Sequence, residues 1–243
     1  MVENHDMVNS LLHLVGCSRI NFGEFSNNDI YFSGNNANIK KGEKALNPPK
    51  EHLKGIIDLI YSDAGARDYF KEAVEKTHPK DEMVKENRLK LAACDYNLEY
   101  VYQEIENNNK WAILEGASKP DLFIESDRFI LIVEGKLTEP HTTKSTTYLM
   151  KRNQMLRHIQ GAIEYNKKNK QDKKIIAFYI VPDTFSEIKE IKNKDSFDEV
   201  INVESVKITD QEYKDLIKSC YYGCTTWEKI EKKFKIEFRA IIE

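Results

Sequence analysis

The chain contains 243 residues, of which 37 are Lys or Arg and 40 are Asp or Glu, and its formal net charge is −3. This length provides the core of one large domain, or of one domain with a substantial extension, and the charge does not by itself suggest a polyanion as partner. The sequence has no run of about 18 apolar residues and no basic region before its N-terminal apolar patch, so we expect no membrane span, no signal peptide and a cytoplasmic location.

Cysteine usage points to reduced thiols. The four cysteines are too few and too scattered for a disulfide framework in a chain of this length. The one close pair, Cys220 and Cys224, has neither a second pair nor a histidine cluster nearby, which argues against a zinc site.

The N-terminal region combines helix-like and strand-like segments. Residues 7–16 favour a short helix, whereas residues 19–25 and 29–34 have the pattern of strands separated by Asn-rich turns. A long helix is expected over residues 50–76, after two prolines that suit a helix start. A second helix is expected over about residues 82–107, where apolar residues recur at helical spacing.

The middle of the chain changes to an alternation of strands and a helix. Strands are expected over residues 110–116, 120–125, 128–136 and 173–182, with a long helix over residues 146–167 between the last two strands. The apolar runs in the third and fourth strands are typical of strands covered on both faces. The order predicts an α/β fold, with a central mixed sheet of about four to five strands flanked by helices.

The remaining tail is expected to form two amphipathic helices, over residues 210–220 and 225–235. We therefore divide the chain into a mainly helical N-terminal extension, residues 1–88, and a main α/β domain, residues 89–243. The extension is a candidate for substrate recognition or for an oligomer contact.

Charged residues stand where the strands of one predicted hairpin end. Side chains alternate along a strand, so Glu134 and Lys136 share a face with Ile130 and Ile132. Asp121 begins the preceding strand, and a hairpin would bring it beside Glu134. Buried charges are costly unless they meet a partner or a metal, and two carboxylates near one point suit Mg²⁺. The alternative interpretation is a pair of solvated strand ends.

These residues resemble a known family. Pro120-Asp121, twelve further residues and then Glu134-Gly135-Lys136 look like the motif of the PD-(D/E)XK nuclease superfamily of restriction-endonuclease-like enzymes. The resemblance covers roughly residues 93–182. It implies a restriction-endonuclease-like core in which Asp121, Glu134 and the carbonyl of Gly135 hold Mg²⁺ or Mn²⁺, while Lys136 positions or activates the water that hydrolyses a DNA phosphodiester bond.

The superfamily often adds an acid from the helix before the sheet, and several residues compete for that role. The candidates are Glu99, Glu104, Glu106 and Glu115, and the sequence does not choose among them.

The helix after the motif supplies two further candidates, Arg152 and Gln154. Arg152 projects from an apolar stripe, where it either reaches the site or extends its charged end to water. Gln154 and Gln160 are similar to the glutamine of the Gln-x-x-x-Tyr motif in RecB-type members, but Tyr165 lies five residues after Gln160, so that subfamily is not assigned. The six histidines show no metal-ligand spacing and are expected at the surface or at helix ends.

Basic residues are concentrated in one segment. Residues 144–175 contain nine Lys or Arg against two acids, which favours either contact with DNA phosphates or a solvated helix and loop. The candidate DNA-binding residues are Lys144, Lys151, Arg157, Lys167, Lys168 and Lys170.

The geometry of the hairpin tests the metal site. Opposite residues of an antiparallel pair share a face, so Asp121 lies with Glu134 only if it pairs with an even-numbered residue. We therefore predict an even-length turn or a bulge between the two strands.

The first hypothesis for function is a Mg²⁺-dependent endodeoxyribonuclease of restriction or defence type that acts on double-stranded DNA, with a homodimer as a candidate assembly. The alternative is a catalytically weak nuclease-fold module that binds DNA or another protein. Retention of Asp121, Glu134 and Lys136 together favours the enzyme.

Overall fold

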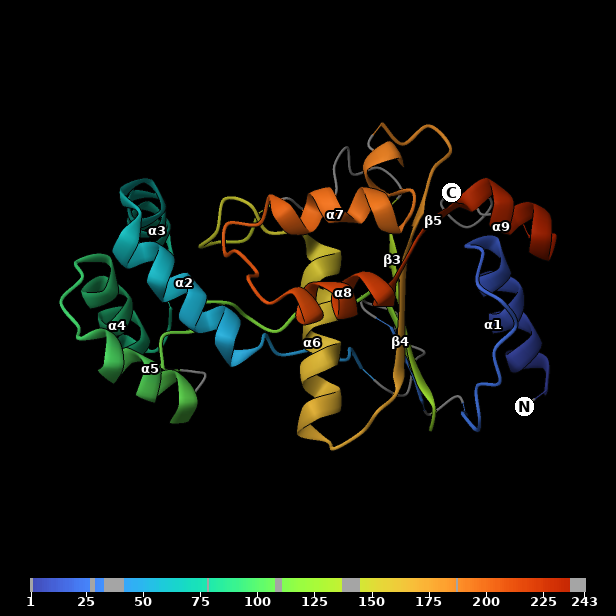
Figure 1. The fold of residues 1–243 in the computed structure, drawn as a ribbon, viewed down its shortest axis with the longest axis horizontal. Coiled ribbons are helices and arrows are strands. Elements are labelled where there is room, and N and C mark those ends of the chain that lie inside the picture. The colour runs from blue at the N-terminus through green and yellow to red at the C-terminus, as the bar shows by residue number, and fades with distance from the viewer. Residues whose placement is uncertain are drawn as a thin grey trace.

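The computed structural model describes residues 2–26, 29–32, 42–77, 79–107, 111–136, 145–186 and 188–236. The described part is an α/β structure with a five-stranded mixed sheet, helices on both faces of the sheet and a separate lobe of helices (Figure 1). Within these ranges, no helix is both long enough and apolar enough to cross a bilayer. The predicted α/β class and mixed sheet are confirmed.

The strands lie side by side in chain order. They are β1 (Ile30–Phe32), β2 (Leu122–Glu125), β3 (Phe129–Gly135), β4 (Lys174–Val181) and β5 (Tyr221–Thr226). The first three are antiparallel neighbours, and β3, β4 and β5 run parallel. The carboxyl ends of the three parallel strands therefore meet at one edge of the sheet, where binding sites of α/β proteins commonly form.

Helices cover the two faces of the sheet unequally (Figure 1). One face packs against α6 (Gln154–Lys168), α7 (Lys194–Asn202) and α8 (Gln211–Cys220), and the other against α1 (Val2–Leu14) and α9 (Trp227–Phe234). The even-numbered apolar residues of β3 belong to the core under α6, and the odd-numbered ones to the core under α1 and α9. The alternation of β3 therefore directs Glu134 toward α6.

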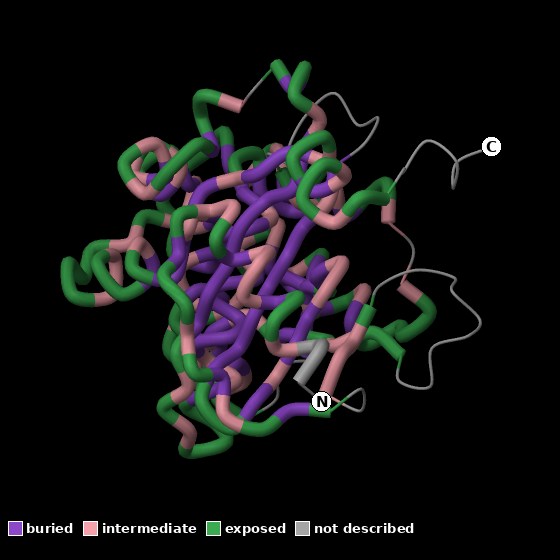
Figure 2. Tube along the Cα trace, turned by 90° about the vertical axis from the view of Figure 1, so that its right-hand side faces the viewer, coloured by how far each residue is buried: buried purple, intermediate pink, exposed green. Residues whose placement is uncertain are grey.

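The helical lobe has a core of its own. It contains α2 (Lys50–Ser62), α3 (Ala64–Lys76), α4 (Glu82–Ala92) and α5 (Leu98–Asn107). Ile56, Phe70, Leu91 and Val101 pack there with Trp111 from the segment that follows α5. Figure 2 shows buried positions concentrated in the sheet and exposed positions gathered on the peripheral helices.

The turn between β2 and β3 has the predicted even length. Glu125 pairs with Ile130, so four residues, Ser126 to Phe129, separate the paired positions. The Ser126 hydroxyl accepts hydrogen bonds from the backbone N–H groups of Arg128 and Phe129, which fixes the turn. Continued by one residue, this register places Asp121 opposite Glu134.

Two predicted long helices are each divided in the structure. Asp63 separates α2 from α3, because its side chain caps α3 by accepting a hydrogen bond from Ala66 N–H. Residues 93–97 separate α4 from α5, where Cys94 has a φ of +56° and Asn97 accepts from the N–H of Glu99. In both cases a short polar side chain satisfies the free N–H groups of a new helix start.

The strand predicted over residues 110–116 is wrong for its described part, residues 111–116. This segment lies in the helical lobe, where the carbonyls of Trp111 and Ala112 accept hydrogen bonds from the side chains of Asn87 and Arg88. These side chains take the place of a neighbouring strand. Trp111, Ala112 and Leu114 are therefore buried without joining the sheet, whereas Ile113 is exposed.

Further boundaries also differ from expectation. Residues 19–25 form no strand, and α6 begins at Gln154 instead of residue 146. Neither α7 nor β5 was predicted. In β5, Gly223 has a φ of +87°, and a Cβ there would lie 2.2 Å from the carbonyl oxygen of Lys192. The structure therefore requires glycine at this position, and a glycine inside a strand weakens the sequence pattern by which strands are predicted.

The described residues of the predicted N-terminal extension contact both parts of the molecule. β1 pairs with β2, and α1 packs against α9. The helices α2, α3 and α4 pack together in the lobe, and α2 also contacts α5. The division at residue 88 stays a prediction.

Candidate active site

Two charged side chains are buried at the carboxyl end of β3. Glu134 is 2% exposed and Lys136 is 6% exposed. Both point toward α6, because strand alternation places them on the same face as Ile130 and Ile132. Glu134 and Lys136 are therefore a buried pair, and the alternative interpretation of a solvated strand end is wrong for these two residues.

One oxygen of Glu134 is shared by two donors. Lys136 Nζ lies 3.1 Å from Glu134 Oε1, and Gln154 Nε2 lies 2.5 Å from the same oxygen. Lys136 Nζ also lies 3.1 Å from Gln154 Oε1. The three side chains thus form a closed triangle of hydrogen bonds, and the structure brings predicted residue Gln154 to the predicted pair.

The second oxygen of Glu134 contacts a histidine. His158 Nε2 lies 3.2 Å from Glu134 Oε2, and the histidine is 1% exposed. Gln154 and His158 are four residues apart on α6 and therefore lie on the same side of that helix. Burial alone raises the pKa of Glu134, but the hydrogen bond and charge of His158, together with the charge of Lys136, lower it overall.

Asp121 and Trp227 hold the strand end from outside this triangle. Asp121 Oδ2 accepts a hydrogen bond from Gly135 N–H at 2.8 Å, and Trp227 Nε1 donates to the carbonyl of Lys136 at 2.6 Å. A Cβ on Gly135 would lie 3.0 Å from the Trp227 ring and 3.6 Å from Asp121 Oδ2. The close approach of the indole thus favours glycine between Glu134 and Lys136.

The donors at this strand end fit Mg²⁺ or Mn²⁺ in kind. Mg²⁺ is commonly held through one or two carboxylates, with water and substrate phosphates completing the octahedron. Asp121 and Glu134 supply two carboxylates, and Gly135 adds a backbone carbonyl. Within the described ranges, no cluster of three or more His, Cys, Asp or Glu side chains is arranged to hold an ion.

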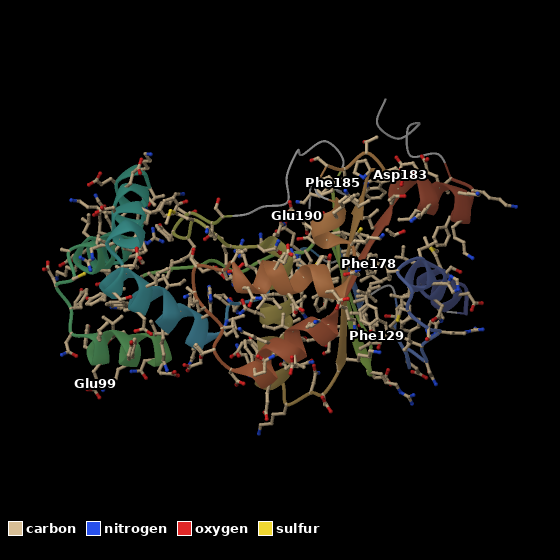
Figure 3. All side chains as sticks on the ribbon, turned by 45° about the horizontal axis from the view of Figure 1, so that its top comes forward. Glu99, Phe129, Phe178, Asp183, Phe185 and Glu190 are labelled. Atoms are coloured by element: carbon tan, nitrogen blue, oxygen red, sulfur yellow. The ribbon has the colours of Figure 1, made fainter. Side chains whose placement is uncertain are left out.

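The acids considered on the helix before the sheet lie in the helical lobe. Figure 3 shows Glu99 at the far end of the lobe from Phe129 and Phe178 of the sheet. Glu104 is on the same helix, α5, and Glu106 forms ion pairs with Lys50 and Lys54. The structure does not bring Glu99 to the end of β3.

Glu115 and Arg152 form a buried ion pair beside the site. Arg152 is 1% exposed, and its Nε and Nη2 lie 2.8 and 2.9 Å from the two carboxylate oxygens of Glu115. Its Nη1 lies 3.2 Å from Glu204 Oε2, and Glu204 Oε1 accepts from Asn153 N–H. Arg152 therefore neither extends to water nor contacts Glu134, and instead it joins the lobe to the start of α6.

Burial and pairing act in opposite directions on this cluster. Burial alone raises the pKa of Glu115, but Arg152 and His52 hold it far below its usual range. Burial lowers the pKa of Arg152, and the charges of Glu115 and Glu204 more than reverse that effect. The pair of Glu115 and Arg152 is thus held in its charged form, whereas burial raises the pKa of Glu204 overall.

The predicted DNA-binding residues are divided between two ends of α6. Lys151 is exposed near the helix start, whereas Arg157 is partly buried and donates to the carbonyl of Gly116. Lys167, Lys168 and Lys170 are exposed at the other end, about 20 Å along the helix from Gln154. Lys144 lies outside the described residues.

Sequence reasoning missed His158, Trp227 and Glu204. The expectation of surface or capping histidines is wrong for His52 and His158, which are 6% and 1% exposed. The available signal for His158 was its spacing of four residues from Gln154 on one helix. Trp227 and Glu204 offered no comparable signal, because they come from elements far away in sequence.

Comparison with known proteins found no matching family model, no matching curated protein and no matching solved structure.

Proposed function

We propose that this chain is a Mg²⁺-dependent endodeoxyribonuclease of restriction or defence type with a PD-(D/E)XK-like core. The observation that carries the proposal is the meeting of Glu134, Lys136 and Gln154 at the carboxyl end of β3. Asp121 lies at the same strand end through its hydrogen bond to Gly135. The structure has two strands, β2 and β3, between α5 and α6, one fewer than the order of helix, three strands, helix and strand with which the resemblance was stated.

Burial of these charges supports a functional role. Taking a carboxylate and an ammonium out of water costs several kcal/mol per ion, roughly, and pairing offsets that cost without adding much stability. An apolar pair of similar volume at this position would serve packing equally well. The charged residues are therefore better explained by chemistry than by the fold.

Each residue has a distinct role in phosphodiester hydrolysis. Asp121, Glu134 and the carbonyl of Gly135 would hold the ion, which when bound polarises the scissile phosphate and lowers the pKa of water. Lys136, held by Glu134 and Gln154, positions the attacking water and balances charge that develops on the phosphate oxygens. Gln154 maintains the orientation of both side chains.

The proposed substrate is double-stranded DNA, and Mn²⁺ is a suitable replacement for Mg²⁺. Lys151 lies near the site, and the three exposed lysines at the far end of α6 are separated from it by about 20 Å. A DNA duplex carries one phosphate charge per roughly 1.7 Å of its axis. A duplex that extends along α6 would therefore offer phosphates to Lys151 at one end of the helix and to the three lysines at the other. A homodimer would present two such sites, one for each strand.

One observation favours the alternative of a catalytically silent module that binds DNA or protein. Both oxygens of Glu134 already accept hydrogen bonds within the protein, so three of the roughly four lone-pair sites of this carboxylate have protein donors without an ion. A polar cluster that only fixes the end of β3 would have the same geometry.

Plasmid cleavage separates the two functions. Supercoiled plasmid is incubated with the purified chain in Mg²⁺, in Mn²⁺ and in EDTA, beside Asp121→Asn, Glu134→Gln and Lys136→Met variants. If the chain is a nuclease, we expect metal-dependent nicking by wild type and no nicking by the three variants. Lys136→Met should still bind the metal ion, because an ammonium group is not a metal ligand. DNA binding without cleavage under every condition would instead establish the silent module.

A further inference from the structure

His158 contacts the carboxylate oxygen of Glu134 that Lys136 does not contact. Two donors, Lys136 and Gln154, share Glu134 Oε1, whereas His158 Nε2 lies 3.2 Å from Oε2. Among the described residues, His158 is the one that donates a hydrogen bond to Glu134 Oε2. Without it, rotation of the carboxylate about its terminal bond, a torsion that is intrinsically broad, would be restrained through one oxygen instead of two.

The helix that carries His158 is tied to the sheet at its start, whereas His158 Nδ1 has no hydrogen-bond partner among the described residues. Its helix, α6, begins at the N-cap Asn153, whose side chain accepts from Leu156 N–H. Tyr179, which pairs with Glu134 across β3 and β4, bonds through its hydroxyl to Asn153 Oδ1 and to Met155 N–H. The helix start is therefore tied to the strand beside Glu134, and His158 follows just over one turn later.

We propose that His158 is a positioning residue that fixes the orientation of the Glu134 carboxylate for a divalent metal ion. This inference rests on the proposed function, because it assigns Glu134 as a metal ligand. Hydrogen bonds to a ligating carboxylate orient it toward the ion, and loss of such a partner typically lowers metal affinity about 10- to 100-fold. His158 acts on metal binding through Glu134 and does not itself contact substrate.

The chain contains a second buried pair with the same geometry and no place at the strand end. His52 Nε2 lies 3.2 Å from Glu115 Oε2, and both side chains are almost fully buried. Replacing His52 therefore removes an equivalent contact in the helical lobe. It separates an effect on metal binding from a general loss of stability.

The experiment measures Mn²⁺ affinity by calorimetry and thermal unfolding for the full chain and its variants. His158→Leu removes the donor, His158→Gln places an amide N–H near the former Nε2, and His158→Asn keeps a shorter amide that cannot reach. Matched controls are His52→Leu and His52→Gln. Plasmid cleavage is followed in parallel at low and at saturating Mn²⁺.

We expect Mn²⁺ affinity to fall about 10- to 100-fold in His158→Leu and His158→Asn. His158→Gln recovers most of the affinity, and cleavage by the weakened variants recovers at saturating Mn²⁺. The His52 variants lower the unfolding temperature and leave Mn²⁺ affinity unchanged. If His158→Leu does not fold, the comparison of His158→Gln with His158→Asn decides the question in the same way.

If the wild-type chain binds Mn²⁺ and cleaves DNA, but His158→Leu and His158→Asn have the same Mn²⁺ affinity as wild type, the role of His158 alone is overturned. An equal loss of affinity in the His52 variants would also overturn it, since the effect would then follow stability. Failure of the wild-type chain to bind Mn²⁺ and to cleave DNA would overturn the proposed function, and the role of His158 with it.

Discussion

Replacement of Arg152 by methionine should destabilise the protein strongly. The Arg152 and Glu115 side chains are 1% and 2% exposed, and the guanidinium binds both oxygens of Glu115 and one of Glu204. Methionine fills similar space but leaves two buried carboxylates without their main partner. Removing one member of a buried pair in this way costs about 3–5 kcal/mol, a large share of the stability of an ordinary domain.

Urea unfolding, followed by circular dichroism, measures the loss. Arg152→Lys retains the charge but cannot make the two parallel hydrogen bonds, so we expect an intermediate loss. In the double variant Arg152→Met with Glu115→Gln, the loss should be smaller than the sum of the single losses, by about 0.5–3 kcal/mol. Lys76→Met, which removes a solvent-exposed ion pair with Glu72, serves as the control and should leave stability unchanged.

A loss below about 1 kcal/mol for Arg152→Met, the size typical of an exposed pair, would refute this reasoning. Strict additivity in the double variant would refute it as well, because it would mean that Arg152 and Glu115 do not stabilise each other.

Three further predictions concern other charged groups. Lys44 Nζ lies 4.1 Å from the centre of the Tyr165 ring and 3.3 Å from Glu125 Oε2, so Lys44→Met should cost about 1–2 kcal/mol in urea unfolding, and an unchanged midpoint would contradict the contact. The pKa of Glu134 is lowered from 4.5 in the folded chain, so the ionised carboxylate stabilises the fold above pH 4.5, and this stabilisation is lost as the pH falls through the lowered pKa. The unfolding temperature of Glu134→Gln should therefore fall less on acidification than that of wild type. Joint replacement of Lys167, Lys168 and Lys170 by Gln should weaken DNA binding and flatten its dependence on salt, whereas an equal salt slope would mean that these lysines do not touch phosphate.

The sequence by itself determined the local features of the site. Apolar runs identified β3 and β4, and the two-residue period of a strand placed Glu134 and Lys136 on one face. The even-length turn also followed from the sequence, given that Asp121 belongs beside Glu134. These features depend on neighbours along the chain, which a pattern of residues records directly.

Tertiary structure decided which distant groups those residues meet. The partners of Glu134 and Lys136 include His158 on α6 and Trp227 on α9, and Arg152 binds Glu115 and Glu204. A buried charge requires some partner, but burial does not specify from which element it comes. That choice depends on how α6, α9 and the helical lobe pack against the sheet, and it is made by contacts between segments that no local pattern links.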